Sequence, residues 1–267
     1  MEYFEPKTID EALTLLDKFG DKAKVIAGGT DVMVDMKFKD EPACLVNIKR
    51  ISGLSEIQSN GAALRIGSLV TIRDLEVSPL VRERLALLWQ ASHQFASLQI
   101  RNTATIGGNI CRASPSGETL APLLVLEARA KLAFSSGEKT EGFDSFFQGP
   151  GKSSAGSAGL LTEIEVPYPA ENSRSVYLKH AVRGPMDIAM VGVAVMVTPD
   201  PSNSRIDEAR IGLGAVAPTP IRAGRTENML RGQAVTSALL QEASQMSGSE
   251  SSPITDQRSS AEYRRWI

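Results

Sequence analysis

The sequence predicts an α+β protein in two parts, and three observations support this. Short apolar strand patterns alternate with amphipathic helical patterns over the first 170 residues. Pro167 and Pro169 then follow a strand pattern and mark a boundary. The last hundred residues carry longer apolar runs, typical of buried strands. We therefore expect a first domain over 1–170, with lobes at about 1–55 and 56–170, and a smaller α+β domain over 171–267.

The first lobe should begin with a helix. Thr8 and Glu11 have the spacing of a capping box, apolar residues follow at helical spacing, and Gly20 is suited to end the helix. Strands are expected at 24–27 and 45–48, with a brief helix from 32 to 36 between them.

The second lobe and the last part follow the same logic. In the second lobe we expect strands at 63–68, 130–134 and 160–166, a long amphipathic helix over 80–96, a helix over 119–128 and a mobile Gly/Ser-rich loop over 149–159. In the last part we expect strands at 175–179, 188–198 and 209–216, short helices over 219–230 and 236–246, and a surface loop over 247–260.

Composition excludes several classes of function. A net charge of −2 and only 5% aromatic residues give no case for nucleic-acid binding. No apolar run approaches the roughly 20 residues of a membrane span, and the amino terminus lacks an apolar signal core, so we expect a cytoplasmic protein. Cys44 and Cys111 are too few to ligate an iron–sulfur cluster, and His93 and His180 lack partners at ligand spacing, so no metal site is expected.

Two stretches share the same pattern of two glycines followed by polar residues. They are Ala27-Gly28-Gly29-Thr30-Asp31 and the run from Thr105 to Glu118. Adjacent glycines permit positive φ and close approach of a ligand, and successive main-chain N–H groups can form a nest for phosphate oxygens. Two such stretches predict one extended phosphate-bearing cofactor held from two sides.

Three side chains in these stretches could add specific contacts. Asp31 and Glu118 could accept hydrogen bonds from sugar hydroxyls, although a carboxylate at a helix start also stabilises the helix by about 0.3–1 kcal/mol. Asn109 could donate its amide N–H to a ring carbonyl or a phosphate. Cys111 lies close by, and we interpret it as a packed, inert thiol.

Two other glycine motifs fail on context. Gly151-Lys152-Ser153 has the end of a phosphate-binding P-loop, but Phe146 stands where its first glycine should be, and no helix pattern follows. The run 212–217 resembles a dinucleotide fingerprint, but Pro218 and Pro220 prevent the helix that must follow it.

The motifs together resemble the FAD-binding medium subunits of molybdenum hydroxylases, the xanthine dehydrogenase and carbon monoxide dehydrogenase type enzymes. The resemblance covers nearly the whole chain and includes both Gly-Gly stretches, the strand from Leu161 to Pro167, the pattern Lys179…Arg183…Asp187-Ile188-Ala189, and the tail from Ser252 to Arg265. It implies a two-lobed FAD-binding domain of the vanillyl-alcohol-oxidase/PCMH-like type, followed by a smaller α+β C-terminal domain.

The resemblance also implies a set of cofactor-binding residues and no catalytic residue in this chain. The implied FAD contacts are Val25, Ile26, Ala27, Gly28, Gly29, Thr30, Asp31, Val32, Phe95, Thr105, Ile106, Gly107, Gly108, Asn109, Glu118, Leu161 and Lys179. Glu118 stands where the family usually has Asp, and Cys111 where a small apolar residue is expected.

The function implied is that of an oxidoreductase subunit. Electrons would pass from a molybdenum cofactor in a large subunit, through two 2Fe–2S clusters in a small subunit, to FAD here and then to an external acceptor, in a heterotrimer that is often doubled. One alternative is a self-contained FAD oxidoreductase, which the lack of a substantial substrate domain after residue 170 disfavours. Another is a nucleotide-binding regulatory module without redox turnover.

Overall fold

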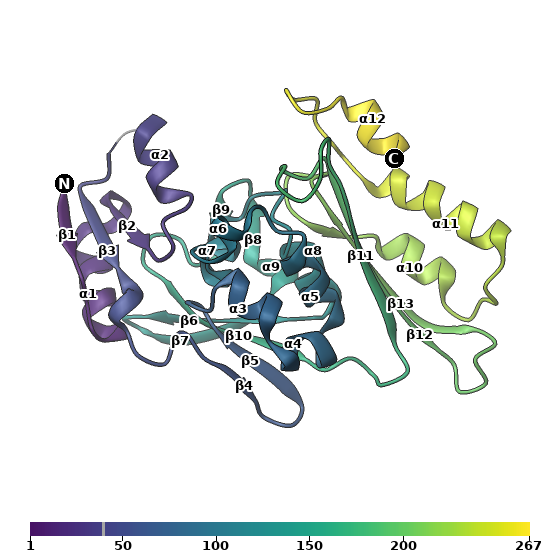
Figure 1. The fold of residues 1–267 in the computed structure, drawn as a ribbon, viewed down its shortest axis with the longest axis horizontal. Coiled ribbons are helices and arrows are strands. Elements are labelled where there is room, and N and C mark those ends of the chain that lie inside the picture. The colour runs from purple at the N-terminus through teal and green to yellow at the C-terminus, as the bar shows by residue number, and fades with distance from the viewer. Residues whose placement is uncertain (39–40) are drawn as a thin grey trace. The chain divides into compact units, whose positions relative to one another are not determined.

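The computed structural model describes residues 1–38 and 41–267, which form two compact units (Figure 1). The first unit contains Met1–Val77, Ser97–Ala113 and Glu127–Pro167. The second contains Ser78–Ala96, Ser114–Leu126 and Tyr168–Ile267. Each unit combines helices with its own sheets, in keeping with the predicted α+β class.

A small parallel sheet opens the first unit. Its strands are β1 (Glu2–Phe4), β3 (Cys44–Asn47) and β2 (Ala23–Ile26), in the order β1-β3-β2. Helix α1 (Ile9–Phe19) is capped by Thr8, whose hydroxyl accepts from the Glu11 N–H, and it buries Leu13 and Leu16 in one cluster with Val46. The predicted helix and its Thr8 cap are therefore confirmed. The reciprocal half of the capping box is not, because the Glu11 carboxylate accepts from the Lys7 N–H over 2.7 Å and not from that of Thr8.

A five-stranded antiparallel sheet forms the larger part of the first unit. In spatial order its strands are β4 (Ile57–Ser59), β5 (Ala63–Gly67), β10 (Leu160–Pro167), β6 (Arg129–Phe134) and β7 (Gly137–Gly142). Along the second half of β10, buried Ile164 and Val166 alternate with half-buried Glu163 and Glu165, as a strand with two unlike faces requires.

Short elements complete the first unit. They are α2 (Val32–Phe38), α3 (Ile72–Val77), α6 (Leu98–Arg101), α7 (Ile106–Arg112), α9 (Phe143–Phe146), the 3₁₀ turns η1 (Gly20–Lys22) and η2 (Ile48–Arg50), and the paired strands β8 (Phe147–Gly149) and β9 (Lys152–Ser153). The Gly/Ser-rich stretch expected to be a mobile loop therefore contains part of a hairpin. Its Gly151 N–H donates to the carbonyl of Ala113 over 3.0 Å.

The second unit is built on a four-stranded antiparallel sheet. Its strands are β11 (Arg174–His180), β12 (Val191–Pro199), β13 (Ile206–Gly214) and β14 (Ile221–Arg222), in that spatial order. Its helices are α4 (Pro79–Arg84), α5 (Ala86–His93), α8 (Leu120–Val125), α10 (Gly224–Leu230), α11 (Ser237–Glu250) and α12 (Ala261–Trp266). Helix α10 packs on β13, and α11 runs beside α10 (Figure 1).

Three expectations for this unit were wrong in extent. The helix expected over 80–96 is divided into α4 and α5, because Leu85 leaves the helical conformation, at φ −131° and ψ 55°, with its side chain fully buried. The helix expected from residue 219 begins only at Gly224, after β14, since the prolines before it favour extended backbone. Helix α11 continues to Glu250, whose carboxylate accepts from the Arg225 and Thr226 N–H groups.

Candidate cofactor-binding site

The first Gly-Gly stretch is a loop between β2 and α2 that presents free donors. Gly29 has a φ of +76°, in the left-handed region. Within the described ranges of the chain, no hydrogen bond engages the N–H groups of Gly28, Gly29, Thr30 or Asp31. Gly28, Gly29 and Thr30 are half-buried. Main-chain donors in such places normally have partners, so four successive unengaged N–H groups indicate a site for an anion.

The second Gly-Gly stretch is not a loop but the first turn of α7. Thr105 is the N-cap, and its hydroxyl accepts from the Gly108 N–H over 3.1 Å. The Ile106 N–H donates to the Val70 carbonyl and the Gly107 N–H to the Ser68 carbonyl. The expected nest at this second stretch is therefore wrong, because acceptors elsewhere in the same unit engage its donors.

The first loop nevertheless lies against the segment that leads into the second stretch, within the first unit. A Cβ built on Gly28 would stand 2.1 Å from the carbonyl oxygen of Thr103 and 3.1 Å from the Cα of Ala104. The first loop therefore rests directly on the residues that lead into Thr105, and only glycine permits this approach. This contact brings the first loop near the start of the second stretch, and a cofactor held from both sides stays a prediction.

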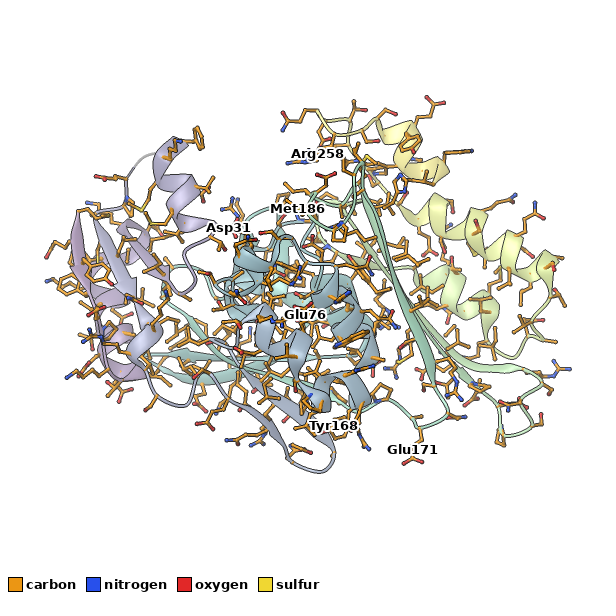
Figure 2. The ribbon with its side chains drawn as sticks, viewed as in Figure 1. Asp31, Glu76, Tyr168, Glu171, Met186 and Arg258 are labelled. Carbon is orange, nitrogen blue, oxygen red and sulfur yellow. The ribbon has the colours of Figure 1, made fainter. Side chains whose placement is uncertain are left out.

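Arg112 fastens the first loop to the end of α7. Its guanidinium contacts both carboxylate oxygens of Asp35, at 2.5 and 3.2 Å, and its Nε lies 3.2 Å from an oxygen of Asp31. Figure 2 shows Asp31 where the loop runs into α2. The Asp31 side chain is 52% exposed and remains accessible to a ligand despite this pairing. We did not predict Arg112 or Asp35, and the only sequence signal was a charged residue a few positions after each glycine pair.

A groove of about 740 Å³ lies along α2 in the same unit. Val32, Met36 and Arg112 are among its walls, so it adjoins the first loop. Its lining carries charges of both signs: the cations are Lys22, Lys24, Arg112 and Lys152, and the carboxylates are Asp21, Asp35 and Glu41. The groove thus offers an apolar wall next to the loop that carries the free N–H groups, and its charged residues nearly balance.

The remaining predicted residues of the first unit have varied surroundings. Val25 and Ala27 pack against the core beside the small sheet, and Ile26 is half-buried. Leu161 is buried in β10 opposite Leu132, and Asn109 is half-buried in α7.

Cys111 lies in the same helix as the second glycine pair. Burial raises the pKa of its thiol to about 12, although Lys24 acts in the opposite direction. The thiol is therefore protonated at neutral pH, in keeping with the inert role expected for it.

Phe95, Glu118 and Lys179 lie in the second unit, where Lys179 links Glu118 to the residue before Phe95. The side chain of Lys179 is 2% exposed, and its Nζ donates to Glu118 over 2.7 Å, to the carbonyl of Gln94 over 3.1 Å and to that of Pro185 over 2.8 Å. These three bonds use all the protons of the ammonium group. Burial raises the pKa of the Glu118 carboxyl, and Lys179 opposes that rise.

The sequence showed none of the groups that support this cluster. Gln90 accepts from the Tyr177 N–H over 2.7 Å, and Gln94 donates to the Tyr177 carbonyl over 3.3 Å, which ties α5 to β11. Glutamine on a helix carries no signal for such a role, because its partner lies more than 80 residues away.

Comparisons with known proteins place the chain in a family. Residues 1–169 match the FAD-binding domain in molybdopterin dehydrogenase, and residues 176–267 match the CO dehydrogenase flavoprotein C-terminal domain. The chain therefore belongs to the FAD-binding subunits of the molybdenum hydroxylases. It is an oxidoreductase component, and the predicted resemblance and fold class are confirmed.

Individual relatives align with this chain over about nine-tenths of their own length or more. The chain is 34% identical to the carbon monoxide dehydrogenase medium chain of Hydrogenophaga pseudoflava, over 98% of this chain and 91% of that one. It is 32% identical to a putative xanthine dehydrogenase FAD-binding subunit of Escherichia coli K12, over 98% and 90%. A solved carbon monoxide dehydrogenase from Hydrogenophaga pseudoflava, lacking the Mo-pyranopterin moiety of its molybdenum cofactor, contains a chain that matches with a TM-score of 0.96, over 100% of this chain and 92% of that one.

Two further observations concern only residues 1–38 and 41–267. None of the helices there combines the length and the apolar character that crossing a membrane requires. Nor do three or more His, Cys, Asp or Glu side chains gather there as a metal site would need.

Proposed function

We propose that the loop from Gly28 to Asp31 holds the pyrophosphate of FAD. The observation that carries this proposal is the run of four unengaged N–H groups in a chain with an FAD-binding domain. Gly28 and Gly29 have no side chains to obstruct phosphate oxygens, and Arg112 partly neutralises Asp31, which would otherwise repel them. The adjoining groove at Val32 offers space for a further part of the cofactor.

The other predicted contacts divide into two roles. The start of α7 directly follows the segment on which the loop rests, and it consists of Thr105, Ile106, Gly107, Gly108 and Asn109. We propose that exposed Gly108 leaves room for the cofactor. In the second unit, Lys179 donates to Oε1 of Glu118 and so holds the carboxylate in place. We propose that the other carboxylate oxygen of Glu118 accepts a hydrogen bond from a sugar hydroxyl of the cofactor. Contacts of Phe95 and Leu161 with FAD stay predictions.

The bound FAD would supply the redox chemistry, and this chain would bind it, orient it and exclude water from it. We propose that electrons arrive from two 2Fe–2S clusters of a small partner subunit, after substrate oxidation at a molybdenum cofactor in a large subunit, and leave to an external acceptor. The relatives support this, because their names describe a medium chain and a FAD-binding subunit and the chain spans about nine-tenths of each. We further propose a dimer of heterotrimers, a domain division at residue 170 and a cytoplasmic location.

The proposal is tested on the protein purified from its native host without separating its partners. We expect flavin absorbance together with molybdenum and iron, and bleaching of all chromophores by one substrate. Flavin on a solitary chain without metal would instead favour a self-contained oxidoreductase. Bound flavin that no copurifying subunit and substrate can reduce would favour a regulatory module.

A further inference from the structure

The last helix of the chain carries a buried arginine. Arg264 in α12 is 6% exposed. Its Nη2 donates to Asp256 over 2.8 Å, and its Nη1 donates to the carbonyl of Ala215 over 3.1 Å. Burying a guanidinium is costly unless its hydrogen bonds are specific, so this arrangement calls for a purpose.

From Ala215 the connection continues to the loop that carries Glu118. Ala215 has a φ of +64°, and in this conformation its N–H donates to the carbonyl of Pro115 over 2.7 Å. Pro115 belongs to the turn that a hydrogen bond from Gly117 to Ser114 closes, directly before Glu118. The Arg264 guanidinium thus holds the carbonyl of Ala215, and the N–H of the same residue holds the turn before Glu118.

The residue before Arg264 contacts the end of the strand that carries Lys179. The Tyr263 hydroxyl lies 3.2 Å from Nε2 of His180, and the two rings pack with centroids 5.9 Å apart. His180 directly follows Lys179 in β11. Figure 2 shows Arg258, on the segment that leads into α12, at the same end of the second unit as Met186, in the connection after β11.

We propose that Arg264 and Tyr263 are positioning residues, which set the placement of Glu118 and Lys179 for binding FAD. This inference rests on the proposed contact between Glu118 and the cofactor. Arg264 contacts Ala215, directly after β13, and Tyr263 contacts His180, the last residue of β11. Two consecutive residues of α12 therefore hold the strand ends on either side of the Glu118–Lys179 pair. The C-terminal segment is thereby a brace for the cofactor-side cluster of its unit.

The test measures the dissociation constant of FAD for the full-length chain in its complex, after removal of the flavin, by flavin fluorescence. Arg264→Met should weaken FAD binding by about tenfold, which corresponds to about 1.4 kcal/mol. Arg265→Met is the matched control, because Arg265 is the exposed neighbour with no partner among the described residues, and it should leave the affinity unchanged.

A double-mutant cycle separates positioning from general stability. If Arg264 acts through Glu118, Arg264→Met should change FAD affinity less than twofold in a Glu118→Gln background. Tyr263→Phe should show the same dependence with a smaller effect, and it serves if Arg264→Met does not fold. Two outcomes would overturn the inference and leave the proposed Glu118 contact standing. In one, Arg264→Met weakens FAD binding equally in the unmodified and the Glu118→Gln chain. In the other, Arg264→Met leaves FAD affinity unchanged although Glu118→Gln alone lowers it. Unchanged affinity in Glu118→Gln alone would overturn the Glu118 contact, and the inference with it.

Discussion

Gly107 and Gly108 are neighbours in the sequence, but side chains at these two positions would meet different surroundings. A Cβ on Gly107 would stand 2.6 Å from both the Cβ and the carbonyl oxygen of Ser68. A Cβ on Gly108 would meet only the Thr105 hydroxyl, at 2.9 Å. The first glycine is therefore required by packing against backbone, while the second is exposed and crowded only by the Thr105 hydroxyl, and we propose that the cofactor lies on its exposed side.

We expect Gly108→Val to abolish FAD retention with little loss of fold, because the branched side chain fills the space that the phosphate must approach. The matched variant Gly107→Val should instead lower the melting temperature of the protein, since it clashes with backbone. The measurements are the flavin-to-protein absorbance ratio and thermal unfolding. A folded Gly108→Val protein with normal flavin content would contradict the proposed role of this turn.

Cys111 should be unreactive in the folded protein. Its pKa of about 12, compared with an ordinary 9.0, lowers the thiolate fraction near neutral pH about a thousandfold. Burial also raises the pKa of Cys44. We therefore expect a thiol-specific chromogenic reagent at pH 8 to label neither cysteine of the native chain and both after denaturation. Rapid labelling of Cys111 in the native chain would contradict its packed role.

At the scale of elements, α2 depends on its ion pairs. It has five apolar side chains among seven residues, yet none of its residues is buried. The link from Arg112 to Asp35 is therefore a main tether between α2 and α7, and it also reaches Asp31 in the loop. Movement of this helix would displace the N–H groups proposed to bind phosphate.

We expect Arg112→Gln to lower the free energy of unfolding by only about 1 kcal/mol, since its ion pairs are partly exposed. FAD affinity should fall more strongly, by about tenfold, because the loop loses its position. Arg65→Gln, which removes an exposed cation beside Glu163 and Glu165 of the large sheet, is the control and should leave FAD affinity unchanged. Equal FAD affinity in the two variants would show that Arg112 does not position the loop.

Elements were predictable where their signals are local. Thr8 and Glu11 mark the start of α1 within four residues, and β11 was expected to within a residue at each end. The long helix over 80–96 was not predictable as two, because its interruption at Leu85 comes from burial of that side chain. Periodicity records which residues are apolar, but not where packing breaks the helix.

At the scale of the whole molecule, we expect acid to destabilise the C-terminal segment after residue 251. Burial alone would raise the pKa of Asp256, but the Arg258 N–H and the Arg264 guanidinium lower it to about 2. A depressed folded-state pKa gives stability that is present above about pH 4 and lost as the pH falls towards 2. We therefore expect the segment after residue 251 to gain hydrogen-exchange rate, relative to the intrinsic rate, as the pH falls from 5 to 2.5.

Asp256→Asn is the matched variant for this prediction. It should show faster exchange at pH 5 already and little further change on acidification, because the titrating group is gone. Asp200 also has a pKa of about 2, set by hydrogen bonds from Ser202 and Arg205 in an exposed turn, and Asp200→Asn should leave this segment unaffected. Identical pH profiles for Asp256→Asn and the unmodified protein would contradict the assignment.

The sequence by itself determined the class of fold, the family and the two Gly-Gly stretches, because strand and helix periods, caps and glycine pairs are local signals. Only the tertiary structure decided which donors remain free for a ligand. The Ile106 and Gly107 N–H groups are engaged by the carbonyls of Val70 and Ser68. Lys179 donates one of its protons to Glu118, 61 residues away. A hydrogen bond to a distant residue depends on how the chain folds back on itself, which no local pattern specifies.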